Sequence, residues 1–232
     1  MIVKSEHDLM QLLDSLLREP KEFWDSFYKE KSNDIPFFCD TPDEHLVKYV
    51  ERENIRPCHV LELGCGNGRN AIYLAKQGFS VTAVDLSKEA IAWATDQAAN
   101  DNVQIHFVCE NIFDLDLPCQ KFNFIYDSGC FHHLAPHRRI SYIQLIQKHL
   151  ANKGQFSISA FKENGKYGGS SLSDQQYYID RSLHGGLGYN KEKLQAIFHE
   201  FMEIEIRDMQ YEHLHENEFG LEDFIVGLFK KA

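Results

Sequence analysis

Three glycines spaced two residues apart are the strongest chemical signal in this sequence. They occur in ELGCGNGR, at Gly64, Gly66 and Gly68, between the apolar run HVLEL and a helical pattern. A glycine turn between a strand and a helix lets the backbone approach a ligand closely. A second apolar run ends on Asp85, about 20 residues downstream, where a carboxylate can accept hydrogen bonds from ribose hydroxyls. The pattern predicts a nucleoside site, whereas the glycines alone would fit any tight turn.

The glycine spacing decides between kinds of nucleoside site. A dinucleotide fingerprint reads GxGxxG, whereas this stretch reads GxGxG, and no GK[ST] follows as a phosphate-binding loop requires. Both of those sites are therefore disfavoured.

The stretch VLELGCGNGRNAIYLAKQGFSVTAVDLS resembles the first two motifs of class I S-adenosylmethionine-dependent methyltransferases. Within that class, GCGNGRN is similar to the tellurite-resistance and thiopurine (thiol) methyltransferases. The resemblance covers residues 20–232 in the order of elements, and its specific motifs occupy residues 58–133. It implies S-adenosylmethionine as the cofactor.

The resemblance also assigns cofactor contacts. It implies that Glu62 lies near the ammonium of the methionine moiety and that Asp85 binds the ribose. Asn111 stands where the family often has aspartate, but its carbonyl still accepts a hydrogen bond from the adenine amine. Arg69 either meets the cofactor carboxylate or lies on the surface. The remaining implied cofactor contacts are Gly64, Cys65, Gly66 and Gly68 in the loop, Leu86 and Ile112 on the adenine, and Asp127.

A second signal, YDSGCFHHLAPHRR, follows the fourth predicted strand, where this family places residues that face the methyl group and its acceptor. We expect Asp127 and Ser128 to line the crevice beyond the carboxyl edge of the sheet. The stretch lacks the [ND]PP[YFW] pattern of enzymes that methylate amino groups of nucleic acids. Cys130 is interpreted as a small pocket residue, because methyl transfer from a sulfonium needs no covalent enzyme intermediate.

His132 and His133 are, with Asp127, the candidate catalytic residues. Since the histidines are adjacent, we expect at most one to face the pocket, where it could accept a proton from the acceptor. A capping or packing role is the alternative for each. Together with His137 they could bind a metal, but no acids or cysteines lie at a diagnostic spacing, so no metal is predicted.

Aromatic side chains could form the walls of the pocket, since aromatic faces favour a positive sulfonium. Ordinary core packing is the alternative. The long connection at residues 162–190 is rich in glycine and tyrosine, and is interpreted as a substrate lid in preference to a disordered segment. The candidate wall and lid residues are Phe23, Trp24, Tyr28, Phe37, Phe38, Phe131, Tyr167 and Tyr177.

The elements that must position these residues alternate between short apolar runs and helical patterns. This order predicts an α/β fold, a Rossmann-like three-layer sandwich with a mostly parallel seven-stranded sheet and a terminal antiparallel strand. Residues 1–57 are expected to form an N-terminal helical cap over the cofactor site, and residues 58–232 the methyltransferase domain, within one structural domain. Strands are expected at 58–63, 79–85, 103–109, 122–127 and 154–161, with two more in the C-terminal part. An amphipathic helix from Ser5 is expected to pack, and another is expected to run on to Gly154.

Composition limits the partners and the compartment. The chain has 232 residues, a net charge of −11 and six cysteines without a CxxC pair. This charge opposes a nucleic-acid backbone. No targeting leader and no apolar run of about 20 residues is found. We expect a cytoplasmic enzyme that methylates a small thiol, chalcogen, amine or hydroxyl acceptor by in-line displacement. An RNA or protein methyltransferase of the same fold, and a non-catalytic S-adenosylmethionine-binding module, remain alternatives.

Overall fold

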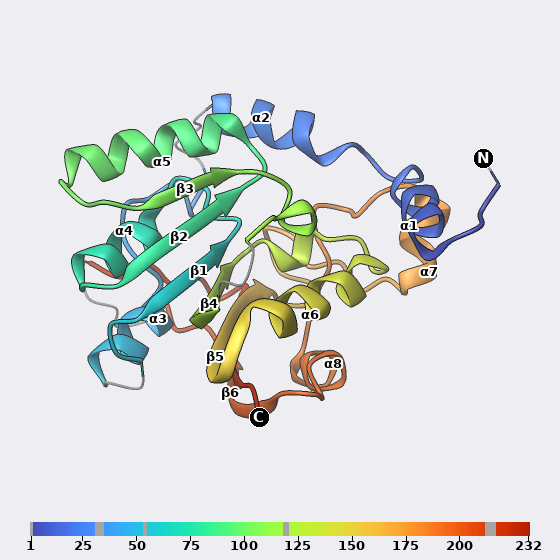
Figure 1. Ribbon diagram of the computed structural model, residues 1–232. Coiled ribbons are helices and arrows are strands. Elements are labelled where there is room, and N and C mark those ends of the chain that lie inside the picture. Colours follow the sequence, from blue (N-terminus) through green and yellow to red (C-terminus); the bar gives the residue numbers. More distant parts are fainter. Residues whose placement is uncertain (1, 31–34, 53–54, 118–120, 212–216) are drawn as a thin grey trace.

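The protein is built on one mixed β-sheet. The computed structural model describes residues 2–30, 35–52, 55–117, 121–211 and 217–232. Within these residues the strand order is β3-β2-β1-β4-β5-β7-β6, and β7 runs antiparallel to both of its neighbours. This confirms the predicted Rossmann-like sheet (Figure 1). The strands are β1 (His59–Leu63), β2 (Ser80–Asp85), β3 (His106–Cys109), β4 (Phe122–Ser128), β5 (Leu150–Phe161), β6 (Met202–Asp208) and β7 (Phe224–Lys230).

Helices cover both faces of the sheet and make a three-layer sandwich. Figure 1 shows α3 (Glu44–Glu51), α4 (Arg69–Lys76) and α5 (Lys88–Asn100) on one face, and α6 (Arg138–His149) and α8 (Lys191–Ile197) on the other. Side chains alternate along β1, so Val60 packs in the core cluster that contains α3 and α4, and Leu61 in the cluster that contains α6. None of the described helices combines the length and apolarity that a membrane crossing requires.

The N-terminal region departs in part from prediction. In α1 (Glu6–Asp14) the Ser5 side chain caps the helix, but none of the nine residues is buried. Leu9 and Leu12 remain 42% and 37% exposed, so the expectation of a packed helix is wrong. Pro20 begins a separate helix, α2 (Pro20–Glu30), which was not predicted. Proline suits the first position of a helix, because its missing N–H would have no partner there.

The expected helix up to Gly154 is also wrong, because α6 ends at His149. Leu150 already pairs with Phe122, and the next pair of the ladder joins Phe124 to Gln155. The residues between form an irregularity in which Lys153 adopts a φ of 61°. The residues ANKG between the two pairs show no strand-like alternation of apolar and polar side chains, so the sequence there resembles the end of a helix.

Candidate functional site

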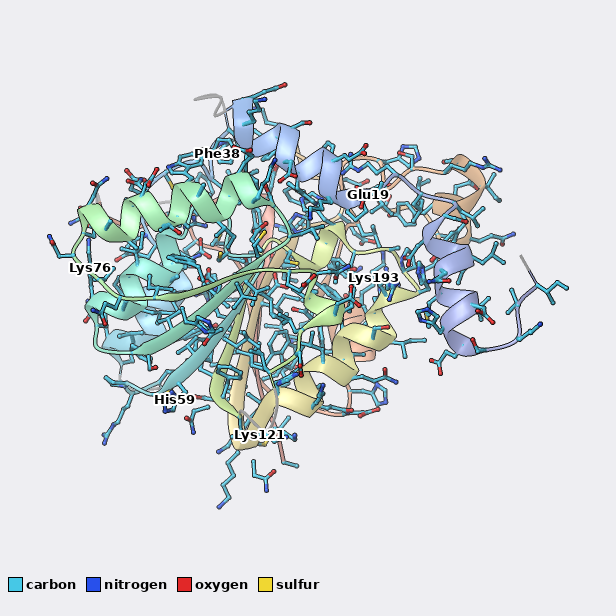
Figure 2. All side chains as sticks on the ribbon, turned by 45° about the horizontal axis from the view of Figure 1, so that its top comes forward. Glu19, Phe38, His59, Lys76, Lys121 and Lys193 are labelled. Carbon is cyan, nitrogen blue, oxygen red and sulfur yellow. The ribbon has the colours of Figure 1, made fainter. Side chains whose placement is uncertain are left out.

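A cavity of about 500 Å³ lies at the carboxyl ends of β1, β2 and β4. Figure 2 shows Glu19 and Phe38 at one edge of the molecule. At the opposite edge lie His59, the first residue of β1, and Lys121, which directly precedes β4. Seventeen of the predicted site residues line this cavity: Trp24, Tyr28, Phe37, Phe38, Glu62, Gly64, Cys65, Gly66, Arg69, Asp85, Leu86, Asn111, Ile112, Ser128, Cys130, His132 and His133.

The glycine loop requires its glycines. Gly64, Gly66 and Gly68 have φ values of 68°, 54° and 83°, which side chains with a Cβ rarely adopt. A Cβ on Gly66 would lie 2.6 Å from the hydroxyl of Tyr28, which packs over the loop from α2. Gly68 lies outside the cavity lining, at the N-cap of α4, where a Cβ would collide with Ala94.

Glu62, near the end of β1, is the least satisfied carboxyl group of the site. Its side chain is 1% exposed, and its Oε2 has no hydrogen-bond partner among the described residues. Burial raises the pKa of this carboxyl to about 8, although the Arg69 charge opposes the rise. A buried, unpartnered acceptor that lines a cavity is suited to a cationic ligand group. The site therefore fits the ammonium that the family resemblance implies.

Asp85, at the end of β2, holds the glycine loop in place. Its Oδ2 accepts from the Gly66 N–H and its Oδ1 from the Ser87 N–H, both at 2.9 Å. Burial raises the pKa of Asp85 to about 6, against these hydrogen bonds. Each carboxylate oxygen has a further lone pair, so both can still accept from ribose hydroxyls.

Arg69 is buried, and its guanidinium is already paired within the protein. The guanidinium donates to the Thr41 carbonyl at 2.8 Å and to Asp43 Oδ1 at 2.5 Å. Asp43 also accepts from the Tyr126 hydroxyl at 2.5 Å. Nearby Arg69 holds the pKa of Asp43 below its usual value, although burial acts in the opposite direction. This buried ion pair fastens the loop before α3 to α4, a link that no local sequence pattern reveals.

The adenine side of the predicted site is only partly as expected. Leu86, Asn111 and Ile112 all line the cavity. However, Asn111 Oδ1 accepts from the Phe113 N–H at 3.0 Å and caps the short helix η1 (Ile112–Asp114). The asparagine thus has a structural role that the family position did not indicate.

Helix α2 supplies the aromatic wall. Asp25 accepts from the Ser87 hydroxyl at 2.8 Å and from the Lys88 N–H at 3.0 Å, and so joins α2 to the start of α5. Trp24 and Tyr28 then line the cavity, whereas Phe23 does not. Phe131 also lies outside the lining, because it is fully buried between Tyr142, Tyr189 and Phe198 in the core.

Asp127 is placed differently from the prediction. It is fully buried and does not line the cavity. Its Oδ1 accepts from the Cys130 and Phe131 N–H groups at 2.9 and 3.3 Å, and its Oδ2 from the Tyr142 hydroxyl at 2.6 Å. Burial raises the pKa of Asp127 to about 7. The expectation that Asp127 touches cofactor or acceptor is corrected: it fixes the turn that carries the histidines.

His132 and His133 both line the cavity, contrary to the expectation that only one would. They lie in the 3₁₀-helix η2 (Phe131–His133), whose tight turn brings the two Nε2 atoms to 3.0 Å. Burial holds the pKa of His132 well below its ordinary value and lowers that of His133 to about 3. His132 also packs on Phe161, with ring centroids 3.8 Å apart.

The segment 162–190 contributes little to the cavity. All of its residues are described, and of them only Leu183 lines it. Tyr167 is 41% exposed, and Tyr177 is buried on α7 (Asp174–Asp180), where its hydroxyl donates to the Ser170 carbonyl at 2.8 Å. The two tyrosines therefore do not contact the cavity as the lid hypothesis expected.

Several lining residues were not predicted, because they come from segments far from the motifs. No group of three or more metal-ligating side chains is found within the described ranges. Asn67 and Asn70 belong to the GCGNGRN string, which was the available signal for them. The other unpredicted lining residues include Asp14, Arg18, Phe113, Leu134, Arg138, Phe219 and Phe224.

Comparison with known proteins identifies the central part of the chain. Residues 60–154 match the methyltransferase domain family. The chain is also similar to the probable S-adenosyl-L-methionine-dependent methyltransferase TehB of Haemophilus influenzae (strain 10810), with 33% identity over 134 residues. That match covers 53% of this chain and 46% of the relative, so the chain spans about half the length of this relative.

Two solved structures show the same fold at 20% identity. TehB from Haemophilus influenzae has a TM-score of 0.62, over 90% of this chain and 67% of that one. Burkholderia thailandensis 1,6-didemethyltoxoflavin-N1-methyltransferase, solved with 1,6-didemethyltoxoflavin and S-adenosylhomocysteine, has a TM-score of 0.66, over 100% and 92%. Residues 60–154 are thus similar to a methyltransferase domain, and the chain has the same Rossmann-like fold as these two structures.

Proposed function

We propose that the chain binds S-adenosylmethionine in this cavity and transfers its methyl group to a small-molecule acceptor. The observation that carries the proposal is the unpartnered Oε2 of Glu62, buried in one cavity with the glycine loop and Asp85. A dinucleotide has no ammonium that would require such a carboxylate. The combination therefore favours a ligand with both a cationic amino acid part and a ribose.

Different residues of the cavity would contact different parts of the ligand. Glu62 would hold the ammonium, Asp85 the ribose, and Leu86, Asn111 and Ile112 the adenine. When bound, S-adenosylmethionine supplies an electrophilic methyl group on a positive sulfonium. The aromatic rings on α2 and before α3 exclude water and present their faces to that charge. The rate is then expected to come mainly from holding the two reactants together.

The acceptor would lie beside Ser128, His132 and His133, with Asp127 as a positioning residue behind them. A cavity of about 500 Å³ suits a compact acceptor in addition to the cofactor. We further propose that residues 1–57 act as a cap over the cofactor, that residues 162–190 border the acceptor entrance, and that the protein works in the cytoplasm. The net charge of −11 supports a small molecule over RNA.

A screen with S-adenosylmethionine carrying a labelled methyl group tests this function. Small thiols, amines, phenols and metalloid oxyanions are offered, with a short RNA and a protein extract as the other classes of acceptor. Label on a small molecule is the expected result. Label on RNA or protein contradicts the acceptor class, and tight cofactor binding without transfer to any acceptor supports a non-catalytic binding module instead.

A further inference from the structure

The two adjacent histidines form a directional hydrogen-bond chain. The Phe161 N–H donates to His132 Nδ1 at 3.2 Å. A ring nitrogen that accepts carries no proton, so neutral His132 has its proton on Nε2. That atom lies 3.0 Å from His133 Nε2, which must therefore accept. Neutral His133 then carries its own proton on Nδ1.

Both rings are neutral in this arrangement. Burial lowers the pKa of each histidine, and the second cause for His132 is its neighbour His133. The two ring lone pairs are already used, one by the Phe161 N–H and one by the His132 N–H. Neither histidine therefore has a free lone pair to take a proton from a methyl acceptor.

One polar group of the pair remains without a partner. His133 Nδ1 is buried and has no hydrogen-bond partner among the described residues, while His133 lines the cavity. Trp24 packs edge-on against this ring, with centroids 4.7 Å apart. A buried N–H donor without a partner is unfavourable unless a ligand supplies the acceptor atom.

The charges around His133 favour an anion. Arg18 lines the same cavity and, among the described residues, has no carboxylate partner; its guanidinium lies 3.3 Å from the centre of the Phe23 ring. Arg18 acts on His133 itself, because its charge lowers the pKa of that ring, although burial is the larger cause. Asp14 in the same cavity is paired with His137 at 2.9 Å and with Arg138, whereas Glu19 only accepts from the Glu22 N–H at 2.8 Å and keeps its charge.

We propose that His133 binds the methyl acceptor as a hydrogen-bond donor through Nδ1–H, and that the pocket selects acceptors that enter with an anionic oxygen or sulfur. This rests on the proposed function. The lone pair of such an acceptor forms the bond to the methyl carbon, while the carbon–sulfur bond breaks and its electron pair stays on sulfur. An acceptor that enters as an anion has no proton to lose, so the step needs no base.

The protonation pattern can be measured without any substrate. Protein labelled with ¹⁵N-histidine is examined by long-range proton–nitrogen correlation, with the signals assigned through His132 and His133 variants. We expect the Nε2–H form for His132, the Nδ1–H form for His133, and no titration of either ring near neutral pH. An unprotonated Nδ1 on His133, or titration of either ring near pH 7, overturns the proposal.

Two matched substitutions test the donor role. His133→Asn places an amide near the position of Nδ1, whereas His133→Gln places one near Nε2, and neither side chain is a base. Binding of para-nitrophenolate and of para-nitroaniline is measured by calorimetry, with S-adenosylhomocysteine present and thermal unfolding as the control for folding. We expect nitrophenolate to be preferred, His133→Gln to weaken its binding roughly 10- to 100-fold, and His133→Asn to stay within about fivefold of the parent.

Other outcomes contradict the proposal in distinguishable ways. A preference for nitroaniline, no binding of either compound, or equal losses in the two variants overturns the donor role. Failure of S-adenosylhomocysteine itself to bind contradicts the proposed function, whereas the protonation pattern of the histidines would still be tested by NMR.

Discussion

Replacing Glu62 by glutamine should have opposite effects on stability and on cofactor binding. Burial raises the pKa of this carboxyl from 4.5 to about 8, so at pH 7 the folded chain keeps a proton that the unfolded chain has lost. That difference lowers the free energy of unfolding by about 3 kcal/mol. Glutamine removes this proton linkage but leaves a buried amide, so we expect a net stabilisation of roughly 1 to 2 kcal/mol.

Thermal unfolding and calorimetric titration read out the two effects. For a chain of this size the gain corresponds to a melting temperature about 2 to 8 °C higher for Glu62→Gln without ligand. Loss of a hydrogen bond between charged groups should weaken S-adenosylmethionine binding roughly 30- to 150-fold. In the parent, affinity should rise up to about tenfold per pH unit as pH approaches 8, because binding needs the ionised carboxylate, whereas the variant should lack this dependence.

Glu44→Gln is the matched control. Glu44 is also fully buried, but it accepts two hydrogen bonds from Arg207, at 2.6 and 3.0 Å, and does not line the cavity. Its substitution should destabilise the protein and leave cofactor affinity unchanged. If Glu62→Gln binds S-adenosylmethionine as tightly as the parent, or is less stable than the parent without ligand, the assignment of Glu62 is refuted.

Three further predictions follow from the neighbouring carboxyl groups. Asp85→Asn should weaken S-adenosylmethionine binding roughly 10- to 100-fold and lower the melting temperature, because its amide nitrogen cannot accept from one of the Gly66 and Ser87 N–H groups that the two carboxylate oxygens satisfy. Asp85→Ala should destabilise the fold further, because both N–H groups lose their acceptors. Calorimetry measures the affinity and thermal unfolding the stability, and unchanged affinity in Asp85→Asn would argue against a ribose contact. Asp127→Ala should lower the free energy of unfolding by roughly 2 to 4 kcal/mol in denaturant titrations, because three hydrogen bonds are lost. If Tyr142→Phe lowers it by the same amount, the hydrogen bonds from the Cys130 and Phe131 N–H groups contribute nothing. Burial raises the folded-state pKa values of Glu62, Asp85 and Asp127 to about 8, 6 and 7. Their joint contribution to stability is therefore full below pH 4 and is lost as the pH rises towards 8. The denaturant midpoints of the parent and of Glu62→Gln should converge at low pH, and a gap that stays constant across the range contradicts the linkage.

The parts of the fold and site that the sequence predicted are those encoded locally. The apolar runs and glycine turns place β1, β2 and β4, and their carboxyl ends necessarily bring Glu62 and Asp85 to the same edge. The two histidines differ from the prediction because adjacent side chains diverge in regular structure, whereas His132 and His133 lie in η2, a 3₁₀ turn held by Asp127.

Long-range contacts account for the rest. Arg69 is bound to Asp43, 26 residues away, and Asp14 to Arg138, 124 residues away. Neither pairing leaves a periodic or spaced pattern. A long-range contact also sets the position of the predicted lid: the Tyr189 backbone N–H donates to the Phe161 carbonyl at 2.8 Å and so holds the end of the segment against β5.

The central claim is that this cavity is the methyl-donor site, and a crystal structure of the protein with S-adenosylhomocysteine tests it most directly. The account predicts the amino group of the ligand within hydrogen-bond distance of Glu62 Oε2 and the ribose hydroxyls on Asp85. A ligand bound with its amino group away from Glu62, or bound outside the cavity, would contradict it.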